Sequence, residues 1–186
     1  MAQGEVNLSV VPRRPDDCGV VIFGASGDLT GRKLVPALYR LFASGATPEH
    51  FYICGAARSE MSQEQFRAKM RQAVESKGAD MSAWERFAAC LHYHPVIYDQ
   101  VETYQTLAQR LDELDTEHGV PGNRILELAI PPTMYQTVAT ILAQAGLSRE
   151  DKGWRRLVVE KPFGSDLDSS QELNQAIGQG FNERQV

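Results

Sequence analysis

The sequence predicts an α/β fold, a doubly wound parallel sheet with helices on both faces. Short apolar runs rich in β-branched residues alternate along the chain with longer segments of helical periodicity, which is typical of a parallel sheet covered on both sides. The 186 residues, 42% of them hydrophobic, suffice for one domain with a good core. No internal repeat or low-complexity segment competes with this interpretation.

Five strands are expected in order along the chain. Residues 1–17 mix charge and proline and are interpreted as an N-terminal arm, so the folded domain is expected at 18–186. The first strand, Val20–Phe23, is apolar throughout and is therefore expected to be buried on both faces. The later expected strands are Phe51–Ala56, Leu91–Val96, Ile125–Ile130 and Leu157–Glu160.

Helices are expected between these strands. Leu34, Leu38 and Leu41 recur at helical spacing after the first strand, and Pro36 marks either the first regular turn or a kink. The later expected helices are 63–77, 83–89, Val101–Glu117 (ending at Gly119), Met134–Ala145 and 168–178.

Right-handed crossovers would wind such a sheet in both directions, and ligands then bind at the carboxyl ends of its strands. The residues that follow the expected strand ends are Gly24, Arg58, Tyr98, Pro131 and Lys161. These positions are therefore the first candidates for a binding site.

The turn after the first strand has features of a phosphate-binding loop. In Gly24-Ala25-Ser26-Gly27-Asp28-Leu29, the glycines permit a tight turn and close backbone approach to a pyrophosphate, and the following helix start offers unpaired amides. The spacing is G-x-x-G rather than G-x-G-x-x-G. It is therefore equally compatible with a plain turn, in which Asp28 caps the helix.

Two basic residues follow later strands. Arg58 stands where NAD-binding folds usually have an acid, and its planar guanidinium suits a 2′-phosphate. Lys161, held between Glu160 and a Pro-Phe-Gly turn, is placed for an anionic ligand. Each is also compatible with an ordinary surface residue after a strand.

Taken together, the segments VIFGASGDLTGRKLVPALYRLF, GAARS, NRILELAIPPTMY and LVVEKPFGSDL resemble the glucose-6-phosphate dehydrogenase family, in family order across residues 20–168. The resemblance implies a Rossmann-type domain that binds NADP. It also implies that Arg58 holds the 2′-phosphate with Ser59 beside it, and that the Lys161-Pro162 bond is cis. The implied coenzyme-binding residues are Gly24, Ala25, Ser26, Gly27, Asp28, Leu29, Thr30, Gly31, Arg58, Ser59, Tyr98, Asp99, Ala129, Pro131, Tyr135 and Lys161.

For the whole enzyme, the resemblance implies oxidation of C1 of glucose 6-phosphate, with Lys161 and Lys33 contacting the substrate. Gly31 departs from the family, where a lysine is common. The family's catalytic histidine, in a motif of the type RIDHYLGKE, falls beyond Val186, as does the substrate and dimerisation domain. No catalytic residue is therefore expected in this chain, which we expect to be inactive alone, and a homo-oligomer is expected of the whole enzyme.

The alternatives are a stand-alone NADP-binding or regulatory module and a subunit that pairs with a separate catalytic chain. The charge composition limits which classes of partner are expected. With 19 Lys and Arg against 24 Asp and Glu, broad nucleic-acid binding is not expected. No apolar stretch of membrane-spanning or signal-peptide length is seen, so a cytoplasmic protein is expected.

The residues that most often bind metals give no predicted site. Cys18, Cys54 and Cys90 are interpreted as buried thiols because none forms a close pair. His92 and His94 alternate along an expected strand and so share a face, but no third ligand is evident. No metal is therefore predicted.

Overall fold

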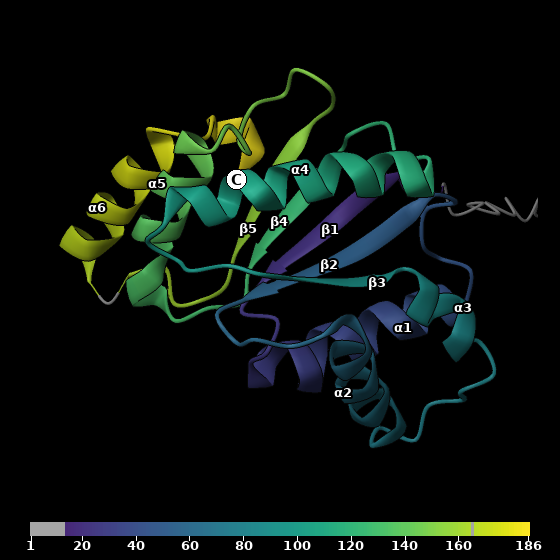
Figure 1. Ribbon diagram of the computed structural model, residues 1–186. Helices are drawn as coiled ribbons and strands as arrows, with labels where there is room; N and C mark the ends of the chain where they lie inside the picture. The colour runs from purple at the N-terminus through teal and green to yellow at the C-terminus, as the bar shows by residue number, and fades with distance from the viewer. Residues whose placement is uncertain (1–13, 165) are drawn as a thin grey trace, which may run out of the picture.

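The structure is a computed structural model that describes residues 14–164 and 166–186. Within them lies one five-stranded sheet in the order β3-β2-β1-β4-β5, with every neighbouring pair parallel (Figure 1). The strands are β1 (Cys18–Phe23), β2 (Phe51–Ala57), β3 (Leu91–Pro95), β4 (Arg124–Leu128) and β5 (Arg155–Val159). The predicted fold class and the five predicted strands are confirmed, with ends shifted by one or two residues.

Helices cover both faces of the sheet (Figure 1). One layer holds α1 (Val35–Ala43), α2 (Gln63–Glu75) and α3 (Trp84–Ala89), and the other holds α4 (Val101–His118), α5 (Tyr135–Gln144) and α6 (Leu167–Gly178). Strand alternation divides the core between them. On β1, Val21 and Phe23 pack in the cluster with Leu107 of α4, whereas Ile22 packs in the cluster with Phe66 of α2.

The first helix starts earlier and less regularly than predicted. A π-helix, η1 (Thr30–Leu34), runs directly into α1, and Pro36 lies in the first turn of α1. The predicted cap by Asp28 is wrong. The start of η1 has no side-chain cap hydrogen bond, and the Asp28 carboxylate forms an ion pair with Arg32 at 3.0 Å.

Other helix ends follow local signals. Ser62 and Gln65 form a reciprocal capping box at the start of α2. Gly119 ends α4 in the left-handed conformation, at φ 69°. Two short 3₁₀ turns, η2 (Pro132–Met134) and η3 (Glu183–Gln185), complete the described elements.

A buried ion network lies at the amino-terminal ends of the strands, opposite the edge formed by their carboxyl ends. Arg124 at the start of β4 is 2% exposed. Its Nη2 lies 2.6 Å from Asp112 and 2.5 Å from Asp115, both on α4. The Tyr52 hydroxyl donates to Asp115 at 2.7 Å, and Lys152 pairs with Asp112 at 2.9 Å. These contacts tie α4 to the sheet, so their role is stability.

The cysteines are free thiols, as predicted. Cys18 and Cys54 are buried and Cys90 is half-buried. Burial raises the pKa of Cys18 to about 11 and that of Cys54 to about 12, which keeps both thiols protonated and unreactive. None of the described helices is long and apolar enough to cross a bilayer.

Candidate functional site

The turn after β1 is built around Gly24. Its φ is +85°, and a Cβ there would lie 2.1 Å from the carbonyl oxygen of Ala129. The Gly24 amide donates to the carbonyl of Ala56 at 2.8 Å, and its own carbonyl accepts from the Gly27 amide at 2.8 Å. Only glycine fits this position, because the backbone must turn here between β1, β2 and the end of β4.

Gly27 serves a different purpose from Gly24. It is exposed and its φ is not in the left-handed region, and a Cβ there would meet only the Gly24 carbonyl oxygen, at 3.0 Å. The φ at Gly27 is therefore open to other residues, and a Cβ there would require the Gly24 carbonyl to shift by a few tenths of an ångström. A side chain at Gly27 would fill the space in front of the loop, where a ligand phosphate would approach.

Two of the predicted loop residues have side chains directed into the protein. Ala25 is fully buried in the core beside α2. Thr30 is also fully buried, and its hydroxyl donates to the Gly24 carbonyl at 3.1 Å. Both side chains hold the loop in shape, so any contact they make with a ligand would come from their backbone amides.

The strand order reverses between β1 and β4, and a hollow of about 410 Å³ opens at this point. We call it the strand-end hollow. It is lined by Gly24, Ser26, Gly27, Arg58, Ser59, Tyr98, Ile130 and Pro131. All of these except Ile130 are predicted coenzyme residues, brought together from the ends of four strands. This is the place where doubly wound folds bind nucleotides.

Arg58 and Tyr98 form one wall of the strand-end hollow. The Arg58 guanidinium lies over the Tyr98 ring, 5.4 Å from its centroid, an arrangement that fixes the direction of an exposed cation. Burial raises the pKa of Tyr98, so its phenol stays neutral. Ser59 Oγ donates to Ser26 Oγ at 3.1 Å, which joins the end of β2 to the loop after β1. Asp99 is exposed and does not line this hollow.

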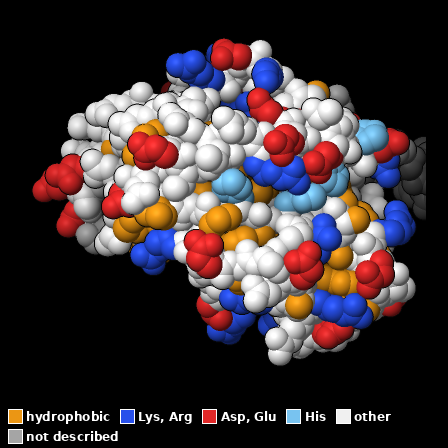
Figure 2. All heavy atoms as spheres, in the orientation of Figure 1, with side chains coloured by type: hydrophobic (Ala, Val, Ile, Leu, Met, Phe, Trp, Pro, Cys, Tyr) orange, Lys and Arg blue, Asp and Glu red, His pale blue; other side chains and the backbone are white. Residues whose placement is uncertain are grey.

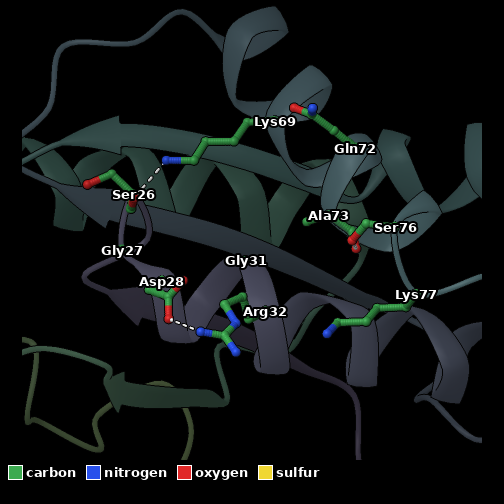
Figure 3. Close-up of a pocket in the computed structure, with 10 residues that line it drawn as sticks. All are labelled: Ser26, Gly27, Asp28, Gly31, Arg32, Lys69, Gln72, Ala73, Ser76 and Lys77. Carbon is green, nitrogen blue, oxygen red and sulfur yellow. Dashed lines mark hydrogen bonds and ion pairs between the residues drawn. The ribbon is translucent and has the colours of Figure 1, made fainter.

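A second hollow, of about 590 Å³, lies on the other side of the loop between η1 and α2 (Figure 3). Lys69 reaches from α2 to the loop and donates to the Ser26 carbonyl at 2.7 Å. Asp28 and Gly31, predicted for the coenzyme, line this α2-side hollow instead. It is the larger of the two but contains no residue from the ends of β2 or β4, so the strand-end hollow is the better candidate site.

The remaining predicted coenzyme residues follow β4 and β5. Ala129 and Pro131 follow β4, and Tyr135 is buried with its hydroxyl donating to the Glu160 carbonyl at 3.3 Å. Tyr135 therefore helps to position the end of β5, next to the predicted Lys161. Lys161 is exposed and its bond to Pro162 is cis, as predicted. Lys33 is exposed in the last turn of η1.

One buried acid was missed by sequence reasoning. Glu127 on β4 is 9% exposed, and its Oε1 has no hydrogen-bond partner among the described residues. Burial, and then the charge of Glu160, raise the pKa of Glu127 to about 7. A charged residue inside the apolar run Ile125–Ile130 was the signal that could have found it. It can hold a proton near neutral pH beside the strand ends.

Comparison with known proteins agrees with this geometry. Residues 21–186 match the family described as glucose-6-phosphate dehydrogenase, NAD binding domain. The glucose-6-phosphate 1-dehydrogenase of Aggregatibacter actinomycetemcomitans is 41% identical over 174 residues, and that of Bacillus subtilis (strain 168) is 38% identical over 167 residues. The alignments cover 93% and 90% of this chain but 35% and 34% of the relatives, so the chain spans about a third of their length.

Solved structures give the same result. A glucose-6-phosphate dehydrogenase in complex with its substrate glucose-6-phosphate matches with a TM-score of 0.82 and 34% identity, covering 91% of this chain and 35% of that one. The enzyme from Mycobacterium avium matches with a TM-score of 0.78 and 29% identity, covering 92% and 36%. The chain therefore belongs to the glucose-6-phosphate dehydrogenase family of oxidoreductases and corresponds to its nucleotide-binding domain, which takes a nicotinamide cofactor.

Proposed function

We propose that this chain binds NADP in the strand-end hollow and prefers it to NAD. The observation that carries the proposal is Arg58, which follows β2 and lies over Tyr98 at the mouth of the hollow. An acid at this position would accept hydrogen bonds from ribose hydroxyls, whereas a guanidinium offers paired donors and a positive charge to a 2′-phosphate.

The residues of the hollow fit the remainder of the coenzyme. Gly27 has no side chain to fill the space in front of the loop, and a helical segment begins directly after it, so a pyrophosphate could approach the backbone amides closely. Ser26 adds a hydroxyl at the rim. On the β4 side, Ala129 and Pro131 present small or rigid side chains next to which a flat nicotinamide ring can lie.

In the whole protein, we infer oxidation of glucose 6-phosphate to the lactone. The bound coenzyme would supply the acceptor for a hydride from C1 of the sugar. Lys161, following β5, and Lys33, on η1, are exposed cations that would bind the anionic substrate. The support is the family membership together with the substrate named for one related structure.

We expect this 186-residue chain to bind coenzyme without turning over the sugar. None of its four histidines lines the strand-end hollow. A positioned base typically contributes ~10²–10⁴-fold to such a reaction. The check is NADPH formation, followed by absorbance at high protein concentration. Turnover that saturates with glucose 6-phosphate in material free of host enzyme would contradict the expectation.

The coenzyme preference is tested by calorimetric titration of NADP and NAD into the wild-type chain and the Arg58→Ala variant. A hydrogen bond to a charged group contributes ~1.5–3 kcal/mol, so the variant should bind NADP about ten- to a hundredfold more weakly and NAD almost unchanged. Arg32→Ala is the matched control, because Arg32 is also exposed beside the loop but lines the α2-side hollow. Equal losses for both cofactors in Arg58→Ala would refute the 2′-phosphate role.

A further inference from the structure

Three potential metal ligands meet where the start of β3 lies against the end of α4. His92 Nε2 on β3 lies 2.8 Å from His118 Nε2 on α4. The ring centroids are 5.0 Å apart, and the rings are nearly perpendicular, at 78°. With Glu117, these residues place three ligand atoms within 4.8 Å of one another. In Figure 2, pale-blue histidine side chains gather at this boundary between the helix and the sheet.

The sequence could not show this cluster, because the two histidines come from elements 26 residues apart. The pair that sequence reasoning considered, His92 and His94, does not form a site. His94 Nε2 lies 3.1 Å from Thr106 Oγ1, on a part of α4 that is three helical turns away from His118. Both strand histidines contact α4, but at different places along it.

The chemistry of the cluster suits a borderline divalent cation. A neutral imidazole offers a lone pair on one ring nitrogen, the form that binds metals. His92 Nε2 and His118 Nε2 share a hydrogen bond, so one of the two rings must carry its proton on Nδ1 instead for both Nε2 atoms to ligate. Tetrahedral Zn²⁺ with Zn–N distances of ~2.0–2.1 Å holds two nitrogens roughly 3.3 Å apart. The two rings therefore need to separate by only about 0.5 Å to admit the ion.

The surroundings supply negative charge and rigidity. Glu117 is held by Arg110 at 2.8 Å, and the same guanidinium binds Glu113 at 2.7 Å, so two carboxylates share one cation. Arg110 also donates to the second Glu117 oxygen, Oε2, at 3.4 Å, so Glu117 would give up this longer hydrogen bond to ligate through Oε2 while Oε1 stays bonded to Arg110. The end of α4 also carries the negative end of the helix dipole, which favours a cation there. The Tyr52 ring, 5.7 Å from the His118 ring, packs beside it and restricts its orientation.

We propose that His92, Glu117 and His118 form a Zn²⁺ site, with water as the fourth ligand. The site lies at the amino-terminal end of β3, whereas the strand-end hollow lies at the carboxyl ends. The ion would thus act as a clamp between an edge strand and α4, and take no part in coenzyme binding. Two histidines and one carboxylate form a ligand set that zinc accepts in proteins.

The test is a calorimetric titration of the 186-residue chain with ZnCl₂ after treatment with EDTA and desalting. Co²⁺ replaces Zn²⁺ in a parallel titration, because its visible absorption reports the coordination geometry. His118→Ala is the main variant, since this side chain is at a helix end and only half-buried. His94→Ala is the matched control on the same strand. Glu117→Gln removes the ligand charge but keeps an oxygen for Arg110.

We expect one Zn²⁺ per chain, with affinity reduced more than about tenfold in His118→Ala and unchanged in His94→Ala. Glu117→Gln should weaken binding less than the loss of a histidine. Intense visible absorption of the Co²⁺ form, lost in His118→Ala, would support the tetrahedral assignment. Absence of binding to the wild-type chain, or equal binding by the wild type and a His118→Ala variant with native circular dichroism, would overturn the proposal.

Discussion

Glu127 makes the stability of this domain depend on pH in a direction opposite to that of most acids. Its carboxyl group is buried on β4, with Glu160 as a nearby like charge, and its pKa rises from an ordinary 4.5 to about 7. Between these two values the folded chain holds a proton that the unfolded chain has released. The free energy of unfolding therefore falls as pH rises through the window from about 4.5 to about 7.

The magnitude follows from the two pKa values. One pH unit of difference between the folded and unfolded pKa corresponds to about 1.36 kcal/mol. The change from 4.5 to about 7 thus corresponds to about 3 kcal/mol, all of it lost above pH 7. Because Glu127 is only 9% exposed, solvent screening reduces this value little. Glu127→Gln cannot ionise at this position. Its free energy of unfolding relative to that of the wild type should therefore rise by about 3 kcal/mol between about pH 4.5 and pH 8.

The assay is urea unfolding followed by circular dichroism across that range, with the difference between variant and wild type plotted against pH. Glu102→Gln, an exposed position in the first turn of α4, controls for the loss of one negative charge. Glu160→Gln should recover part of the effect, because it removes the neighbouring charge that helps to raise the pKa of Glu127. A difference between Glu127→Gln and wild type that stays constant with pH would refute the reasoning.

Three further predictions concern stability. The wild type should lose about 3 kcal/mol of its free energy of unfolding as pH falls from 6.5 to about 4, because buried His92 stays neutral in the folded chain but is protonated in the unfolded chain. His92→Gln should remove this loss. Identical acid unfolding of both proteins would contradict the prediction. Gly24→Ala should destabilise the chain by at least ~1–3 kcal/mol, because Gly24 has a positive φ and a Cβ there would clash with Ala129. Gly27→Val should instead keep native circular dichroism and lose coenzyme binding, so urea midpoints and NADP titration separate the two variants. Retained NADP binding in the folded Gly27→Val variant would exclude the close-approach role. Asp115→Ala should cost about 1–3 kcal/mol, because it leaves the buried Tyr52 hydroxyl without its acceptor and buried Arg124 with Asp112 alone. Removing Glu113, an exposed partner of Arg110, should cost at most ~1 kcal/mol in Glu113→Ala. Similar urea midpoints for the two variants would show that burial does not set the cost.

The elements of the fold were predictable because their signals are local. A short apolar run rich in β-branched residues, such as Val20–Phe23, is typical of a strand buried on both faces, and the structure places it in the middle of the sheet. Pro36 and Gly119 marked the first turn of α1 and the end of α4 through their own backbone restrictions. The candidate site was predictable for a related reason, since the ends of parallel strands meet at one edge whatever their order in the sequence.

The features that were missed depend on which side chains the sheet brings together across long intervals of sequence. Pairing of β4 with β1 and β5 buries Glu127, and the packing of α4 over β2 and β3 brings His118 to His92 and Asp115 to Tyr52. No spacing in the sequence encodes these pairs. The prediction that Asp28 caps the helix was wrong for another reason, because Arg32 one turn later binds the Asp28 carboxylate.

The two ends of the sheet carry polar groups for opposite purposes. At the amino-terminal ends of the strands, Arg124 is bonded to two carboxylates and is shielded from solvent, so its charge is neutralised within the protein. At the carboxyl ends, Arg58 is exposed and lies over a ring that orients its guanidinium without neutralising the charge. A cation held in this way remains available to an anionic ligand. Arg58 is therefore the residue on which the coenzyme preference of this domain should depend.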